Sequence, residues 1–160
     1  MSLDFFVAGH YRGTYAGVSV GDTKGGFELD FSLKGQAIDQ SDAYGETLLD
    51  YVYRGGDCRI TFNCLAYKPG SLNPFSPWSV LGTLGPIGKL GSDHAVPLVL
   101  SAAVGTTASN APASLTGPKA ITPPNWTGKL LYHSVLREVP VQLAFLPYAA
   151  GSGVQWFTQA

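Results

Sequence analysis

The sequence predicts an all-β protein with one short flanking helix. Two observations point to this class, and the length of the chain indicates its domain organisation. Apolar and polar residues alternate with a period of two along several segments, which is the pattern of half-buried strands. Gly (20 residues) and Pro (11) are abundant and cluster between these segments, where they favour turns. A chain of 160 residues is long enough for one hydrophobic core, so a single domain over residues 1–160 is expected.

Two segments show the alternation most clearly. The first, 27–35, reads FELDFSLKG, and its buried face is expected to consist of Phe27, Leu29, Phe31 and Leu33. The second, 58–66, reads CRITFNCLA, and its inward residues are expected to be Cys58, Ile60, Phe62 and Cys64. The two cysteines would lie on one face about 20 Å apart, too far for a disulfide, and are expected as small buried apolar residues.

The remaining elements follow from similar patterns. Strands are expected at VPLVLSAAV (96–104), GKLLYHSVL (128–136), VPVQLAFLPY (139–148) and GVQWFTQA (153–160), the first of them covered on both faces because it is continuously apolar. The segment 76–85, SPWSVLGTLG, spaces Trp78, Leu81 and Leu84 by three residues after a proline and is expected to be the short helix. The segment 101–125 is rich in Ser, Thr, Pro and Gly and is expected to be a long loop.

The charge of the chain narrows the classes of function. Charged residues make up 13% of the chain, against a usual share of about 25%. So little surface charge favours a protein that buries surface against copies of itself. The net charge is −1 and no run of Lys or Arg occurs, which argues against a protein that grips nucleic acid through its phosphates. The N-terminal MSLDFFVAGHYRG lacks the apolar core of a secretory signal and no stretch is long enough for a membrane span, so a soluble chain made in a cytoplasm is expected.

No catalytic motif emerges. The histidines, His10, His94 and His133, have no metal-ligand spacing, and no serine lies in a G-x-S-x-G turn. The sequence therefore predicts no catalytic residue, no metal site and no cofactor.

Carboxylates concentrate in one stretch, IDQSDAYGETLLDYVYRGGDCRITF (38–62). They are Asp39, Asp42, Glu46, Asp50 and Asp57. A calcium loop counted from Asp39 would need a glycine at its sixth position, which is Tyr44. A structural interpretation fits better, because DQSDAYG can close one strand and RGGD can begin the next. The intervening ETLLDYVY is too apolar for a free loop, so it is expected to lie against its own sheet or a neighbouring subunit.

The order of these elements resembles the tail tube (major tail) proteins of tailed bacteriophages and of related gene-transfer particles. In that pattern a strand leads to an acidic turn, a glycine and an aspartate, and a further glycine opens the next strand. The matching positions here are Asp39, Gly45, Thr47, Asp50 and Gly55. The resemblance covers roughly residues 12–66, followed by the segment 76–85 and the closing WFTQA in similar order, whereas the segment 107–128 has no counterpart in it.

The resemblance implies a β-sandwich-like or barrel-like subunit that forms hexameric rings, which stack into a tube that conducts DNA. Residues 39–55 would then reach a neighbouring ring or subunit, with carboxylates that act as contact or lumen charges and have no catalytic role. The implied contact residues are Asp39, Asp42, Tyr44, Glu46, Leu48, Leu49, Asp50, Tyr51, Tyr53 and Arg54. The implied partners are other copies of the chain, tape-measure, tail terminator or sheath proteins, and DNA that passes without specific binding. The implied location is the virion tail, assembled in the host cytoplasm, with no membrane partner.

Three alternatives stay open. A capsid-decorating or head–tail connector protein would share the fold and form trimers or closed rings that never extend. A carbohydrate-binding β-sandwich is indicated by Trp78, Trp126 and Trp156 beside eight tyrosines, although aromatic residues at protein interfaces explain these equally well. A metal-dependent hydrolase built on the acidic stretch would lose its activity on chelation.

Overall fold

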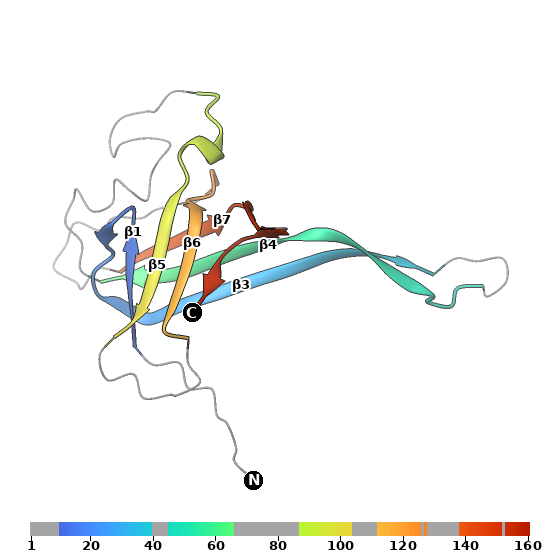
Figure 1. Ribbon diagram of the computed structural model, residues 1–160, viewed down its shortest axis with the longest axis horizontal. Helices are drawn as coiled ribbons and strands as arrows, with labels where there is room; N and C mark the ends of the chain where they lie inside the picture. The colour runs from blue at the N-terminus through green and yellow to red at the C-terminus, as the bar shows by residue number, and fades with distance from the viewer. Residues whose placement is uncertain are drawn as a thin grey trace, which may run out of the picture.

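A computed structural model of the chain shows a β-sheet body from which a long two-stranded arm projects (Figure 1). The structure describes residues 10–39, 45–65, 87–103, 112–125, 127, 138–151 and 153–160. The strands are β1 (Tyr11–Tyr15), β2 (Val18–Ser19), β3 (Thr23–Ile38), β4 (Asp50–Cys64), β5 (Val96–Ala102), β6 (Ser114–Ile121), β7 (Val139–Phe145), β8 (Tyr148–Ala150), β9 (Gly153–Gln155) and β10 (Thr158–Gln159).

The predicted all-β class is confirmed. Within the described ranges the helical structure is limited to a single 3-10 turn, η2 (Gly91–Asp93). The predicted helix at 76–85 and the predicted strand at 128–136 lie outside the described residues.

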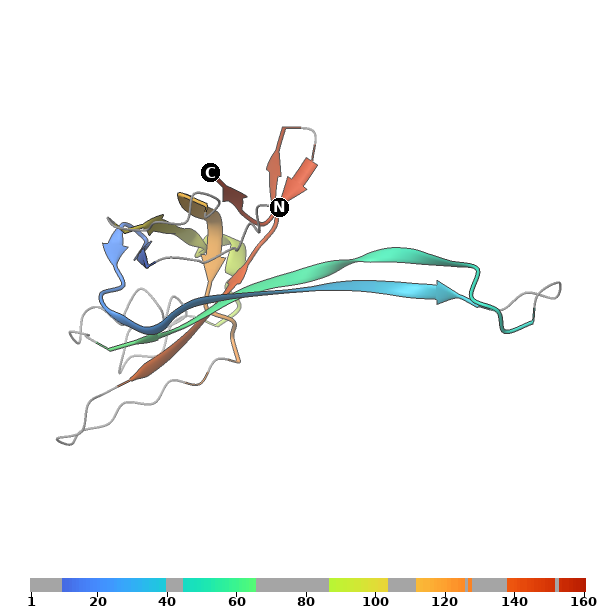
Figure 2. The same cartoon turned by 90° about the horizontal axis from the view of Figure 1, so that it is seen from below.

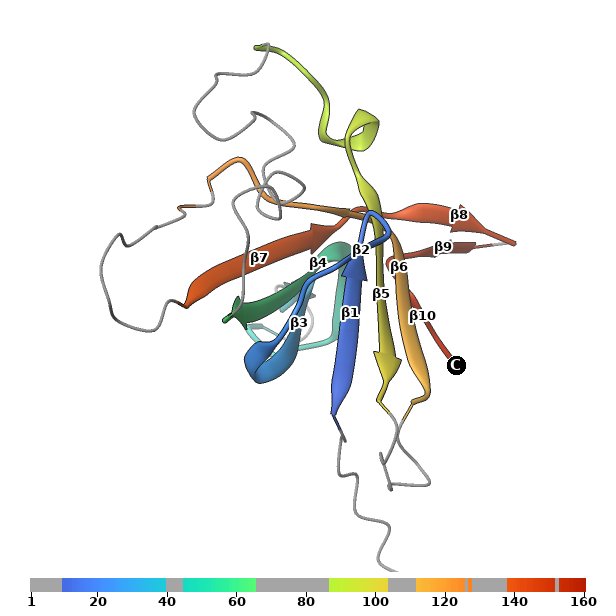
Figure 3. The ribbon, with the colours of Figure 1, turned by 90° about the vertical axis from the view of Figure 1, so that its left-hand side faces the viewer.

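The strands form one antiparallel sheet in the order β2-β1-β5-β6-β7-β4-β3, and β10 also pairs with β6. A separate small hairpin joins β8 and β9. The sheet curls until its two ends approach each other (Figure 3). At that seam β1 meets β3, and a Cβ added to Gly13 would lie 2.8 Å from the ring of Phe27. The body is therefore a half-open barrel.

Apolar side chains from the inner face of the sheet fill this barrel. The core consists of Tyr15, Val20, Cys58, Ile60, Phe62, Cys64, Leu98, Leu100, Leu115, Ala120, Val139, Val141, Leu143 and Phe145. Both cysteines are buried and unpaired as predicted, and burial raises the pKa of each thiol to about 11. The inward face predicted for 58–64 is also confirmed, because every second residue of this stretch is buried.

Three expectations about the later strands are wrong. The strand β5 buries Leu98 and Leu100 but leaves its alternate residues partly exposed, so it is covered on one face only. Residues 114–121, expected within a long loop, form β6 in the middle of the sheet. This strand tolerates Pro118 because the proline lies where the pairing with β5 changes register, and a ladder at such a point does not need its missing N–H. The closing segment 153–160 is split between β9 and β10.

Candidate interaction site on the projecting arm

The arm consists of residues 31–38 of β3 and 50–58 of β4. The two strands pair along its whole length, from Phe31 opposite Cys58 to Ile38 opposite Asp50. Pairing of β4 with β7 covers only residues 59–64, so beyond them the arm leaves the body as a free ribbon (Figure 2). Neither outer edge of this ribbon has a strand partner in the described part of the chain. Unpaired strand edges of this kind can add strands from other chains.

One face of the arm carries large apolar side chains. Cross-strand partners share a face, as do residues two apart along a strand. The residues of this face include Phe31, Leu33, Tyr51 and Tyr53, here called the apolar strip, because Tyr53 is opposite Gly35 and Tyr51 is opposite Ala37. Their exposed fractions are 66%, 67%, 67% and 64%. The strip is thus apolar, one-sided and open to solvent.

The apolar strip continues the core-facing side of the barrel. Phe27 and Leu29 precede Phe31 on the same face of β3, and both pack against the core. The rings of Phe27 and Phe62 lie with their centroids 5.0 Å apart. The expectation that Phe31 and Leu33 are buried is wrong. Their side chains point to the predicted face, but the barrel ends before it reaches them.

The pairing of the arm contains a β-bulge. Lys34 is opposite Gly55, whereas Gly35 is opposite Tyr53, so Arg54 is an extra residue in β4. Gly55 has a φ of +111°, a conformation that residues with a Cβ rarely adopt. The bulge increases the local twist of the ribbon and ends the simple alternation of β4 at this point.

The opposite face of the arm is held by polar interactions. Lys34 Nζ lies 2.7 Å from Asp57 Oδ2, and the hydrogen bond from Lys34 lowers the pKa of Asp57. Arg54 Nη1 donates a hydrogen bond of 2.9 Å to Gln36 Oε1, across the bulge. These polar groups satisfy one another, so this face does not require a partner to do so.

The tip of the arm is also partly apolar. Ile38 and Val52 are exposed on the face opposite the apolar strip, and Leu48 and Leu49 are exposed in the connection between the strands. Leu49 N donates a hydrogen bond to Ile38 O at 2.8 Å, which continues the ladder beyond the last strand residue.

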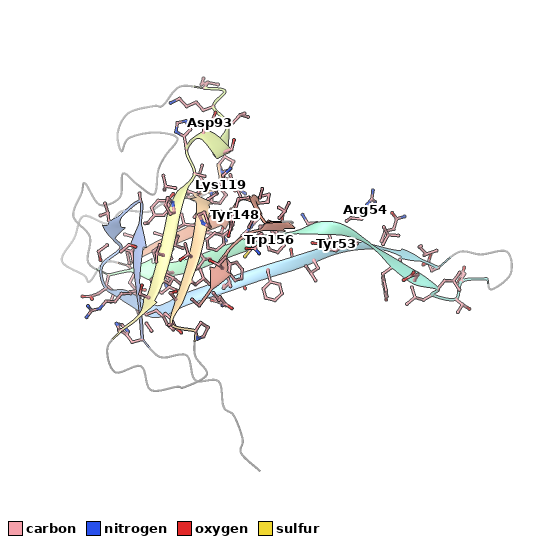
Figure 4. The ribbon with its side chains drawn as sticks, in the orientation of Figure 1. Tyr53, Arg54, Asp93, Lys119, Tyr148 and Trp156 are labelled. Atoms are coloured by element: carbon pink, nitrogen blue, oxygen red, sulfur yellow. The ribbon has the colours of Figure 1, made fainter. Side chains whose placement is uncertain are left out.

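A tryptophan supports the root of the arm. Trp156 is half-buried against the core and its indole lies over Gly56, where an added Cβ would be 2.9 Å from Cη2 of the indole and 2.5 Å from the backbone oxygen of Ser32. Figure 4 shows Trp156 where the arm leaves the body and Tyr53 and Arg54 further along it. The glycine therefore permits a packing contact that holds the arm against the body.

The structure changes the boundary of the predicted contact segment. Residues 39–55 were expected to form a loop, but β4 begins at Asp50, so the connection spans 39–49 and the rest is strand. Tyr51 and Tyr53 lie on the apolar strip, and Arg54 is the bulged residue. Asp50 stands opposite Ile38, and its Oδ1 accepts a hydrogen bond of 2.7 Å from the backbone of Tyr51.

The other residues of that segment give no chemical cluster. Asp39 and Glu46 are exposed, and Asp42 and Tyr44 lie outside the described residues. Across the described ranges no three His, Cys, Asp or Glu side chains are placed to hold a metal ion.

A hollow of about 540 Å³ opens in the body, between β1 and the body half of β3. Its lining is His10, Tyr11, Gly25, Gly26, Phe27, Leu29, Ile60, Leu100, Pro112, Leu115 and Gln159. None of these lining residues is a carboxylate or a thiol, so together they offer no acid/base pair of the kind that hydrolysis uses. The hollow is a recess whose lining is mostly apolar.

Sequence reasoning missed the bulge, the support by Trp156 and the extent of the arm. One signal was present: the adjacent Gly55 and Gly56 within a strand pattern are typical of a bulge or of a close approach by another group, and here the first marks the bulge and the second the contact with Trp156.

Comparison of the sequence with protein-family models and with curated proteins found no match. Among the residues with described positions, no helix is long and apolar enough to cross a membrane.

Proposed function

We propose that this protein is a structural subunit of a bacteriophage tail tube. In this proposal copies of the chain close into hexameric rings, and the arm of each copy contacts a neighbouring copy as the rings stack. The tube then conducts DNA through its lumen in the virion, and the chain has no catalytic role. Tape-measure, tail terminator or sheath proteins are the further partners that this role implies.

The observation that carries the proposal is the exposed apolar strip on a projecting arm. Phe31, Tyr51 and Tyr53 are each about two-thirds exposed, and at about 200 Å² per aromatic side chain they present roughly 400 Å² of surface. A stable protein–protein interface buries about 800 Å² on each partner, so these three rings would supply about half of one side. In a monomer this apolar surface would stay in water and would not stabilise the protein.

The free edges of the sheet support assembly in the same way. Among the described residues, the outer edge of β3 has no strand partner, and β4 has none on its outer side over residues 50–58. In a ring, each copy contacts the next through two different surfaces. Such contacts can cover the unpaired strand edges and so prevent uncontrolled aggregation.

The charges of the arm fit a channel for DNA. Asp39, Glu46 and Asp50 are exposed towards its far end. Carboxylates that line a channel repel phosphates, so DNA would slide through instead of binding.

Negative-stain electron microscopy of the concentrated protein, together with its mass in solution, tests this proposal. Rings or tubes with a central hole are the expected result. Closed rings or trimers that never extend would favour a capsid-decorating or head–tail connector protein. A monodisperse monomer at every concentration would contradict the proposal, and a glycan-binding screen and an activity screen with and without chelator would then take priority.

A further inference from the structure

The side on which the two arm tyrosines lie depends on the bulge. In a regular ladder without it, Arg54 would be opposite Gly35, and the residues that precede Arg54 in β4 would each move by one position. Tyr51 and Tyr53 would then lie on the opposite face of the arm from Phe31. The extra residue returns both tyrosines to the side of Phe31.

The result is an arm with two unlike faces. Phe31 and Leu33 near the root and Tyr51 and Tyr53 further out form one continuous strip. The bulged Arg54 itself is tied to the other face by its hydrogen bond to Gln36.

We propose that the arm packs against a second copy of this chain through the apolar strip alone, and that the bulge at Arg54 and Gly55 is the register device that sets this side. The inference deepens the proposed function and rests on it. The bulge positions the contact residues, and the side chain of Arg54 need not touch the partner.

Two observations favour a second copy as the occupant. The exposed rings supply about half of the area that one partner of a stable interface buries, so the contact needs the rest of the strip and an apolar receiving surface. The same chain offers such a surface in the hollow of about 540 Å³ between β1 and β3, whereas its own arm extends away from the body (Figure 2). A contact between two different surfaces of one chain is heterologous and can close into rings or continue as a stack.

Two variants of the full chain distinguish the effect of the face on which the tyrosines lie from the effect of the bulge itself. A serine inserted between Lys34 and Gly35 gives Arg54 a partner, removes the bulge and turns Tyr51 and Tyr53 to the opposite face. Deletion of Arg54 also removes the bulge, but Gly35 stays opposite Tyr53, so the tyrosines remain on the strip. The readout is the concentration at which sedimentation velocity and electron microscopy detect assemblies.

The insertion is expected to raise this concentration by about 30-fold or more, the effect of losing one dominant interface residue, whereas the deletion leaves it within a few-fold of wild type. Circular dichroism and the urea midpoint of the dilute subunit show whether each variant is folded. If the insertion prevents folding, Tyr51→Lys and Val52→Lys provide the same comparison on an intact bulge, since these neighbours lie on opposite faces, and only Tyr51→Lys is expected to block assembly.

Assembly of the folded insertion variant, or of Tyr51→Lys, at the wild-type concentration would overturn the inference and leave the proposed function standing. Loss of assembly by the deletion would also overturn it, because the tyrosines keep their side in that variant. Failure of the wild-type chain to assemble at any concentration would overturn the proposed function itself.

Discussion

Replacement of a single ring on the apolar strip gives a quantitative test of its role. We expect Tyr53→Ser to weaken association between copies while the isolated subunit remains as stable as wild type. The side chain lies on the arm, where 64% of it is exposed, so the folded subunit gains little from its ring. Exposed positions of this kind usually change stability by no more than about 0.5 kcal/mol.

The expected size of the effect follows from the exposed area. At about 200 Å² for an aromatic side chain, 64% corresponds to roughly 130 Å² available for burial. Burial of apolar surface stabilises by about 25 cal/mol per Å², which gives about 3 kcal/mol if the ring is fully covered in the assembly. This corresponds to about a hundredfold increase in the dissociation constant of each contact.

Sedimentation velocity over a concentration series measures this change, and urea unfolding at the lowest concentration measures the stability of the subunit. The matched control is Val52→Ser, because Val52 is the adjacent residue, is 48% exposed and lies on the opposite face of the arm. The control is expected to associate nearly as the wild type does. An unchanged dissociation constant for Tyr53→Ser would refute the reasoning, and so would equal losses for the two variants.

Further predictions concern the body and the polar face. Gly117→Ala is expected to lower the free energy of unfolding by about 1–3 kcal/mol, because the added Cβ would lie 2.0 Å from the ring of Phe145; calorimetry would show a fall in Tm of several degrees. Lys34→Met is expected to raise the pKa of Asp57 towards 3.8 in an NMR titration, because the hydrogen bond that lowers it is lost. The stabilisation that this ion pair provides is present above pH 3.8 and is lost as the pH falls through the lowered pKa. Burial raises the pKa of Tyr15 to about 12, so stability is expected to decline as the pH rises from 10 towards 12, and Tyr15→Phe should flatten this decline in urea midpoints.

The Gly117→Ala prediction has a control within the chain, and each of the other two has an outcome that would contradict it. Gly153→Ala should be neutral, since no atom lies within 4 Å of its added Cβ, and an equal loss there would show that the close contact of Gly117 is not the cause. An Asp57 pKa that is unchanged by removal of Lys34 would contradict the assignment of that ion pair. If the stability of Tyr15→Phe falls as steeply between pH 10 and 12 as that of wild type, other groups cause the decline.

The sequence predicted the faces of the strands but not what covers them. Alternation in the stretch FELDFSLKG placed Phe27 and Phe31 on one side, and the register confirms this. The pattern has the same form whether a body packs on the strand or the strand leaves the body, so it could not show that Phe27 is half-buried and Phe31 exposed. Burial depends on where the neighbouring strand β7 ends, which local periodicity does not contain.

Turn-forming composition explains the other errors. The segment with Gly117 and Pro118 has the residues of a loop, yet it forms a central strand because partners on both sides satisfy its backbone. Likewise the pair Gly55 and Gly56 was interpreted as the turn that opens a strand, whereas in the structure the strand passes through it. Propensity is a weak constraint where long-range pairing decides, and both cases depend on contacts between distant parts of the chain.

The support of the arm by Trp156 also has a consequence for biosynthesis. Gly56 and Trp156 are one hundred residues apart in the chain, although they touch in the folded subunit. At about 5–20 residues per second, a ribosome needs roughly 5–20 s to pass from one to the other. During this interval the two strands of the arm have left the ribosome without the indole that holds their root.

A nascent chain therefore displays its apolar strip before it can hold the arm at its final angle. Neighbouring chains on one messenger RNA would carry such unsupported arms at high local concentration. If the proposed contacts between copies depend on the angle between arm and body, they form only after Trp156 has been added. In the proposed assembly, the order of synthesis would thus delay association until the chain extends beyond Trp156.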